Sequence, residues 1–296
     1  MLRQFLALIF FVPTIASSQD YIDVFKVGLN HNFSSYFENT DFTTTVNYID
    51  ASFLTGTKRF ATDGFHVGGD FYYYKVQMFP NSEPADLYST TLVLSYTAEL
   101  SDRTTGIFTL LPKLASDYDV ISLKDVYLGG SVIIKNHQSR RLHYRYGVYG
   151  SYEAFGLLTT PTVGLYYMSD DNDFEADITL PLSADIRFQL KYFSLGIEYA
   201  GTNRSFRVYD YKADDVYAEQ RRLEFGGYFR LRTPNPNTWL KAKLGYAFNS
   251  LAVYNVRDKI DFYFIDFVLR NDRTQLNPDL RGSLFFKVEL LYRFPY

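Results

Sequence analysis

The side chains best placed to do chemistry in this chain are charged residues that occupy one face of their strand patterns. They are Lys26, Arg187, Glu198, Arg222, Glu224, Lys241, Lys243, Lys287 and Glu289. Residues two positions apart lie on the same face of a β-strand. Acids and bases on neighbouring strands can pair and stiffen that face, or they can line a passage that selects solutes. Because the two signs nearly cancel, the sequence assigns no preference for cations or anions.

Patterns for metal binding and catalysis are weaker. The four histidines, His31, His66, His137 and His143, show no metal-ligand spacing such as HxxxH, so no metal and no cofactor is assigned. Ser131 and His143 fall on neighbouring predicted strands, as a lipid-acting enzyme would need. However, the chain has no Gly-x-Ser-x-Gly elbow, and a Ser and a His often meet by chance among strands rich in Ser and Thr. No catalytic residue is assigned.

The strand pattern is clearest at residues 283–296. Every second side chain there is apolar or aromatic, whereas the alternate face carries Lys287, Glu289 and Arg293. A period of two predicts a strand with one apolar and one charged face. The stretch ends on an aromatic residue and resembles the terminal strand of bacterial outer-membrane β-barrels. In such a barrel, the apolar face points outward at lipid and the charged face points into the lumen.

The segment 87–100 supports this interpretation. Tyr88 and Tyr96 lie toward the two ends of its apolar face, and Leu92 and Leu94 lie between them. Aromatic rings near two interfaces, with aliphatic side chains between, are typical of a strand that faces lipid.

Such patterns predict an all-β protein, a single closed antiparallel transmembrane β-barrel of about fourteen strands. The strands are expected near residues 25–30, 43–53, 64–76, 87–100, 106–112, 125–135, 142–152, 161–167, 174–180, 184–189, 193–199, 222–231, 239–248 and 283–296. Pro181 separates the ninth strand from the tenth because proline cannot donate to the ladder. Twelve strands is the alternative, since this break and the second strand rest on the weakest patterns. An even number is typical of bacterial single-chain barrels, with both termini in the periplasm.

The predicted connections alternate between short and long. Short ones at residues 101–105, 136–139, 169–173, 191–192 and 233–237 are expected to be periplasmic turns. Longer segments, near residues 32, 79, 115, 155, 210 and 249, are expected at the opposite end. The last of them, 249–280, is too long for a structureless loop. We expect it to extend the strands as a hairpin or, as lower-ranked alternatives, to fold into the mouth or to meet a partner.

The composition fits a barrel better than a helical membrane protein. Aromatic residues make up 19% of the chain and charged residues 21%, and the mean hydropathy is −0.17. A barrel averages an apolar outside with a polar inside, so its mean hydropathy resembles that of a soluble protein. A Tyr-rich secreted β-sandwich is the soluble alternative. The absence of cysteine excludes a disulfide framework, and a net charge of −3 excludes a basic nucleic-acid-binding surface.

The first residues have the pattern of a secretory signal peptide. Arg3 precedes an apolar stretch at residues 5–13, and the small residues Ala16 and Ser18 predict cleavage after Ser18. The apolar stretch is too short to span a bilayer as a helix, which needs about 20 apolar residues. The expected organisation is therefore a signal peptide at 1–18 followed by one barrel domain at 19–296. The expected location is the outer membrane of a Gram-negative bacterium.

With these features in place, the chain resembles the uncharacterised outer-membrane β-barrel proteins of Bacteroidota. The resemblance rests on the Tyr- and Phe-rich strands, on Leu-Pro-Lys-Leu-Ala-Ser-Asp at residues 111–117, on the strand at 239–248 and on the aromatic terminus at 292–296. It covers nearly all of the predicted mature chain. It implies an architecture, and it transfers no catalytic or binding residue.

The function that these observations favour is a channel or a small-solute binding and transport protein, without turnover. The first alternative is a structural or secretion-associated partner protein whose barrel is filled by side chains. The second alternative is an outer-membrane lipid-acting enzyme. The expected partners are outer-membrane lipid, small solutes in the lumen, and the barrel-assembly machinery, which would recognise the C-terminal strand. No nucleic acid is expected as a partner.

Overall fold

The computed structural model of the chain describes residues 21–56, 64–211, 214–264, 267–268 and 271–295. The predicted signal peptide, its cleavage site after Ser18 and the final Tyr296 lie outside the described residues, so these expectations stay predictions. Among the described residues, no helix is long and apolar enough to cross a membrane.

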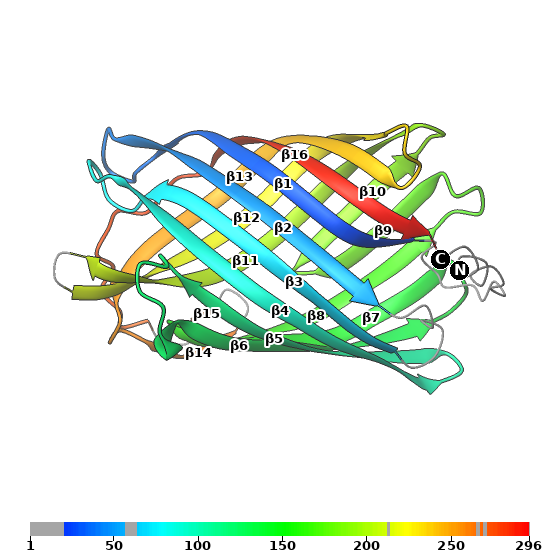
Figure 1. Ribbon diagram of the computed structural model, residues 1–296, viewed down its shortest axis with the longest axis horizontal. Coiled ribbons are helices and arrows are strands. Elements are labelled where there is room, and N and C mark those ends of the chain that lie inside the picture. Colours follow the sequence, from blue (N-terminus) through cyan, green and yellow to red (C-terminus); the bar gives the residue numbers. More distant parts are fainter. Residues whose placement is uncertain (1–20, 57–63, 212–213, 265–266, 269–270, 296) are drawn as a thin grey trace, which may run out of the picture.

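Fourteen antiparallel strands form a closed transmembrane β-barrel (Figure 1). They are β1 (Tyr21–Tyr36), β2 (Thr43–Gly56), β3 (Gly64–Gln77), β4 (Pro84–Ser101), β5 (Thr104–Ser116), β6 (Val126–His137), β7 (Leu142–Glu153), β8 (Gly156–Met168), β9 (Phe174–Leu180), β10 (Ser183–Gln189), β11 (Phe193–Tyr211), β12 (Asp214–Arg232), β13 (Thr238–Asn255) and β16 (Ser283–Pro295). Consecutive strands pair with each other, and β16 closes the ring by pairing with β1. The prediction of fourteen strands is confirmed, including the break at Pro181, and twelve is wrong.

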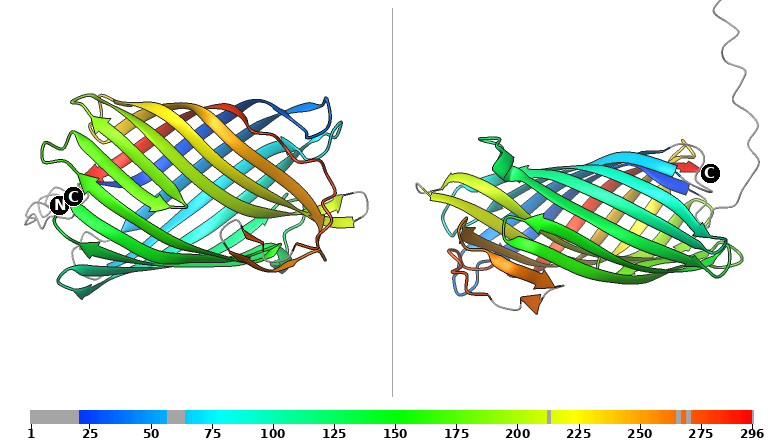
Figure 2. Two further views of the ribbon diagram at one scale, coloured as in Figure 1. Left: turned by 180° about the vertical axis from the view of Figure 1, so that it is seen from behind. Right: turned by 90° about the horizontal axis from the view of Figure 1, so that it is seen from below.

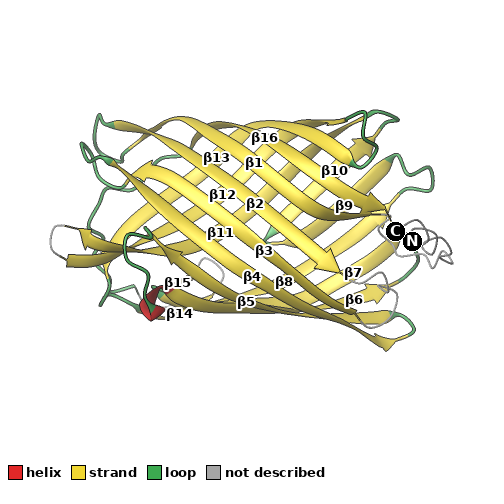
Figure 3. Cartoon of the chain, in the orientation of Figure 1, coloured by secondary structure: helices red, strands yellow, loops and turns green. Residues whose placement is uncertain are grey.

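The ring has two ends that differ in structure. Tyr21 at the start of β1 lies opposite Pro295 at the end of β16, and we call this the terminal end. We call the opposite end the far end. Two short strands, β14 (Ile260–Phe264) and β15 (Phe267–Val268), lie there outside the ring, together with the 3₁₀ helix η1 (Leu123–Asp125) (Figure 3).

The barrel is apolar outside and charged inside. Leu244 is 59% exposed and its register partner Phe286 is 43% exposed, whereas Lys243, next to Leu244 in sequence, is only 1% exposed. The predicted opposite faces of the strands account for this pattern, since successive side chains of a strand point to opposite sides of the sheet. Lipid would cover the exposed apolar side chains, so the sandwich alternative, which would bury them between two sheets, is wrong.

Two of the expected long connections are instead tight. Only Ala154 and Phe155 separate β7 from β8, and β11 ends at Tyr211 just before β12 begins at Asp214. β12 and β13 are longer than predicted, because their far parts are buried on both faces and so lack a clear alternation of apolar and polar residues. The segment 249–280 was expected to form a hairpin above the membrane. Its first residues do lengthen β13 to Asn255, but β14, which follows, pairs in parallel with β8.

At the far end, β11, β12 and β13 fold into the barrel (Figure 2). Arg207 of β11 pairs with Ser116 of β5, a strand on the other side of the ring. The inner face of the hairpin packs on the inner wall through an aromatic core, in which Phe206 lies 6.3 Å from Tyr72 and 6.4 Å from Tyr74 between ring centroids. The far half of the lumen is therefore largely filled.

The other face of the same hairpin is also covered. Tyr217 of β12 and Tyr254 of β13 pack with Phe155, Ile260 and Tyr263 in a second, smaller core. Consecutive residues of β12, from Val216 to Gln220, are therefore all buried. Ile260 and Tyr263 of β14 thus cover this second face of the folded-in hairpin, a role that the sequence did not predict.

We predict that Leu244→Arg destabilises the folded barrel by about 2–4 kcal/mol, because Leu244 lies midway along the apolar face of β13 and a buried charge is costly at the bilayer midplane. The free energy of unfolding in lipid vesicles would be measured by urea titration. Leu123→Arg is the control, since Leu123 is 90% exposed on η1, and its effect should stay within about 0.5 kcal/mol. Equal effects for both variants would contradict the assignment of the apolar face to lipid.

Candidate functional site

The structure places eight of the nine predicted charged residues in one buried network on the inner wall. Lys26 comes from β1, Glu198 from β11, Arg222 and Glu224 from β12, Lys241 and Lys243 from β13, and Lys287 and Glu289 from β16. All except Lys26 and Glu198 are less than one tenth exposed. The closed ring brings the first strand beside the last, so residues at opposite ends of the sequence meet.

The network is continuous from strand to strand. Lys243 Nζ lies 2.9 Å from Glu198 Oε1 and 3.1 Å from Glu224 Oε2. Lys241 pairs with Glu198, and its Nζ lies 3.1 Å from Glu289 Oε2.

Lys287 and Arg222 extend the chain of pairs in two directions. Lys287 Nζ lies 3.1 Å from Glu289 and 2.8 Å from Asp50, and Lys26 Nζ lies 3.6 Å from the same Asp50. Arg222 Nε donates to Glu224 Oε1 at 2.5 Å. Each buried charge therefore has an opposite charge at hydrogen-bond distance, which offsets much of the cost of its desolvation.

Arg187 belongs to a separate cluster. It forms ion pairs with Glu175 on β9 and, at 2.8 Å, with Asp185 on β10, and Tyr228 donates to the same Asp185 at 2.6 Å. The nine residues therefore form two structures, a long network and a local cluster at the β9–β10 hairpin.

Sequence reasoning missed Asp50 and Tyr48, which connect β2 to the network. Tyr48 donates to Glu224 Oε1 at 2.6 Å, and its ring lies 4.7 Å from the Arg222 guanidinium carbon. Both residues fall on one face of β2 together with Ser52. An inward tyrosine obscured the alternation because its apolar ring made both faces of β2 appear hydrophobic.

The ion pairs of the network determine whether its charges can bind solutes. Five cations, Lys26, Arg222, Lys241, Lys243 and Lys287, meet four carboxylates, Asp50, Glu198, Glu224 and Glu289. Charges held this closely to one another are poorly available to passing ions. The network therefore acts on the stability of the inner wall, and the site for a solute must be sought elsewhere in the lumen.

The candidate catalytic pair does not form. In the register of β6 and β7, His143 lies opposite His137, whereas Ser131 lies opposite Tyr149, six residues away along β6. The His143 ring instead stacks on Tyr166, with 5.0 Å between ring centroids. Within the part of the chain that the structure describes, no group of three or more His, Asp or Glu residues could hold a metal ion.

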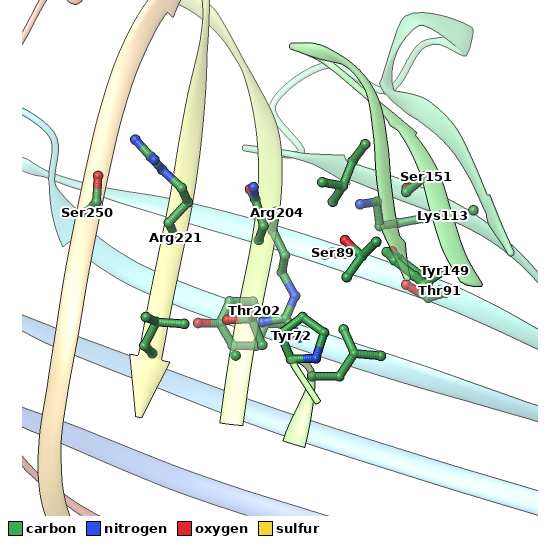
Figure 4. A pocket seen from close by; sticks show the side chains of 18 of the residues that line it. Tyr72, Ser89, Thr91, Lys113, Tyr149, Ser151, Thr202, Arg204, Arg221 and Ser250 are labelled. Carbon is green, nitrogen blue, oxygen red and sulfur yellow. The ribbon is translucent and has the colours of Figure 1, made fainter. Parts of the chain in front are cut away.

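A cavity of about 560 Å³ lies between the inner wall of β3–β8 and the folded-in strands β11–β13 (Figure 4). Its polar lining has hydroxyl groups, two amides, three basic side chains and two carboxylates. These residues are Asp70, Tyr72, Ser89, Thr91, Lys113, Tyr149, Ser151, Thr160, Tyr199, Thr202, Asn203, Arg204, Arg221, Asn249, Ser250 and Asp279. A volume of this size suits a small-molecule ligand.

Several cavity residues have polar groups that are not fully used within the described structure, among them Asn203, Arg221 and Asn249. The buried side-chain oxygen and nitrogen of Asn203 have no hydrogen-bond partner. Arg204 lies over the Tyr72 ring at 4.0 Å, and no ion pair joins it to a carboxylate of the described residues. By contrast, the Lys113 ammonium is paired with Glu153 at 2.5 Å. Buried polar groups usually have partners, so this part of the cavity is the better candidate for a binding site.

We expect Lys243→Met to lower the free energy of unfolding by roughly 3 kcal/mol, because it leaves Glu198 and Glu224 buried with one partner fewer. The matched control is Lys75→Met, whose partner Asp86 lies at 3.8 Å in an exposed pair, and which should cost less than about 1 kcal/mol. Urea unfolding in vesicles would measure both. A loss in Lys243→Met no greater than that of the control would show that the network does not stabilise the wall.

No protein-family model and no curated protein matches this chain. Among solved structures it is similar to the deltaS2 mutant of the TodX monoaromatic hydrocarbon channel, with 9% identity over 91% of this chain and 90% of that chain and a TM-score of 0.39. For the beta domain of the Bordetella autotransporter Brka, identity is 11% over 91% and 99%, with a TM-score of 0.34. For Acinetobacter baumannii OccAB4, identity is 8% over 94% and 100%, with a TM-score of 0.29. With TM-scores this low, the function must be sought in the geometry of the cavity.

Proposed function

We propose that this chain is an outer-membrane protein that binds small solutes in its lumen and passes them across the membrane without turnover. The terminal end then faces the periplasm, as in other bacterial barrels, and lipid surrounds the exposed apolar face. We also propose that the barrel-assembly machinery recognises β16 and that a signal peptide directs export. The resemblance to Bacteroidota barrels supports this location.

The observation that carries the proposal is the cavity with its partly unsatisfied polar lining. The structural alternative, a barrel filled by side chains, has support from the aromatic core around Phe206. However, that core leaves a cavity of about 560 Å³ beside it, and the buried amide atoms of Asn203 in the cavity lining have no partner in the described structure. The distance in register between Ser131 and His143 removes the one residue pair that favoured an enzyme.

We predict that vesicles containing the protein release small solutes faster than empty vesicles, and that Ser89→Trp slows this release several-fold. Ser89 is buried and lines the cavity, so an indole there would occupy space that a solute needs. The control is Leu92→Trp on the same strand, because Leu92 is 44% exposed on the apolar face. Stopped-flow light scattering would follow release.

Folding of each variant would be checked by the shift in gel mobility that follows heating. Wild-type release no faster than that of empty vesicles would reject transport and favour the structural alternative.

We further predict that the wild-type protein gives no large, steady conductance in a planar bilayer. The core of Tyr48, Tyr72, Tyr74 and Phe206 fills much of the far half of the lumen, which leaves little room for an axial column of water. Steady, salt-dependent current steps would instead show that a wide axial path is open and that the core does not obstruct it.

A further inference from the structure

Among the described residues, no strand completes the wall of the barrel between β8 and β11. Pairing of β8 with β9 stops at Val163 opposite Leu180, and pairing of β10 with β11 stops at Ser183 opposite Ala200. Both outer strands continue beyond these points, β8 to Gly156 and β11 to Tyr211. The β9–β10 hairpin, with its turn at Pro181 and Leu182, therefore ends while its neighbours go on.

The two neighbours then separate. The first residues of β8 pair with β14, from Gly156 opposite Ile260 to Thr159 opposite Phe264. The tip of β11 turns to the opposite wall, where Arg207 pairs with Ser116. No described strand lies between residues 160–162 of β8 and residues 202–204 of β11. The gap ends at Ser205, whose N–H and hydroxyl both donate to the Glu153 carboxylate at the end of β7.

This interruption falls at the depth of the membrane. The seven residues of β9, at about 3.3 Å each and a tilt of about 40°, span roughly 18 Å of an apolar band about 25 Å tall. Unpaired backbone at this depth is tolerated where it borders a polar cavity or protein, but not where it contacts lipid. The edge of β11 meets this requirement because Thr202, Asn203 and Arg204 line the cavity.

The cavity itself reaches from the lumen to the lipid-facing surface. Its lining includes Ser89 and Ser151, which are buried on the inner wall, and also Phe248, which is 55% exposed on the outer face of β13. Gly201, Leu223 and Phe248 form one outward row across β11, β12 and β13 in the strand register. The cavity therefore has an apolar rim and a polar interior.

Arg204 is the cavity cation best placed to bind an anion, because Lys113 is paired with Glu153 and Arg221 Nε lies 3.5 Å from Glu219 Oε1. Lys113, Arg204 and Arg221 line the cavity with Asp70 and Asp279. Asp279 already accepts hydrogen bonds from the Ser250 hydroxyl and from the amides of residues 251 and 280. Arg204 has no ion-pair partner among the described residues, and a guanidinium group matches the geometry of carboxylate and phosphate oxygens.

We propose that the gap between β8 and β11 is a lateral opening through which an amphiphile with an anionic, oxygen-rich head moves between lipid and cavity. The head binds Arg204 and Thr202, which share one face of β11, and the apolar tail lies against Leu182, Tyr199, Leu223 and Phe248 at the rim. This inference rests on the proposed solute-binding function and names its substrate class.

Dodecyl phosphate tests the binding site. Wild-type protein in nanodiscs should bind it, as counted by native mass spectrometry after release from the disc, and Arg204→Gln should weaken binding about tenfold or more through loss of a charged hydrogen bond. Thr202→Val, which keeps the side-chain size and removes the hydroxyl, should also weaken binding and serves if Arg204→Gln fails to fold. Unchanged binding in both variants would overturn the site.

Two further probes test the class of ligand. Dodecanol and inorganic phosphate should each bind much more weakly than dodecyl phosphate. Equal binding of inorganic phosphate would show an anion site that needs no apolar tail, and equal binding of dodecanol would show that the head charge is irrelevant. Either result would overturn the assignment to anionic amphiphiles.

Leu182→Trp tests the opening. This substitution places an indole at the rim and should slow the transfer of dodecyl phosphate from vesicles to the protein several-fold, whereas Leu244→Trp, on the apolar face away from the rim, should not. An unchanged rate in Leu182→Trp would overturn lateral passage.

The release assay separates this inference from the proposed function. Solute release that Ser89→Trp slows, without any binding of dodecyl phosphate, would reject the amphiphile and keep transport. Binding of dodecyl phosphate without any release would reject transport and keep the site.

Discussion

The structure depends on one constraint, that backbone N–H and C=O groups in contact with hydrocarbon must find partners within the chain. A sheet can meet it only by closing on itself, and β16 does so by pairing with β1. Closure leaves each strand one face for lipid and one for the lumen. The period-two pattern of the sequence then becomes an apolar exterior, represented by Leu244 and Phe286, around a charged interior.

The charged interior follows from the same constraint. Polar side chains excluded from the lipid face gather inside a narrow ring, where their desolvation is costly unless each finds a partner. The network of Lys241, Lys243, Glu198, Glu224 and their neighbours provides such partners across six strands. Its near neutrality explains why the large number of lumen charges does not by itself indicate an ion-selective pore.

In one region, between β8 and β11, the described strands do not pair with each other across the wall, and the cavity lies there. The β9–β10 hairpin is too short to continue the wall, β11 turns inward, and β14 pairs with the first residues of β8. The same displacement fills the far half of the lumen with aromatic rings and leaves a cavity between the displaced strands and the inner wall of β3–β8. The departure from a regular barrel thus both closes the axial route and creates the proposed lateral one.

The amino-acid sequence by itself determined the fold class, the number of strands, the break at Pro181 and the side of each strand that carries Lys243 or Glu289, because all of these follow from local alternation and from proline chemistry. Tertiary structure decided the features of those segments in which the alternation of apolar and polar residues carries no information. The far halves of β12 and β13 are buried on both faces, so their length and inward fold depend on what packs against them. The contacts of Asp50, the free amide of Asn203 and the gap beside β11 depend on strands brought together only by closure of the ring, and no spacing within one segment encodes them.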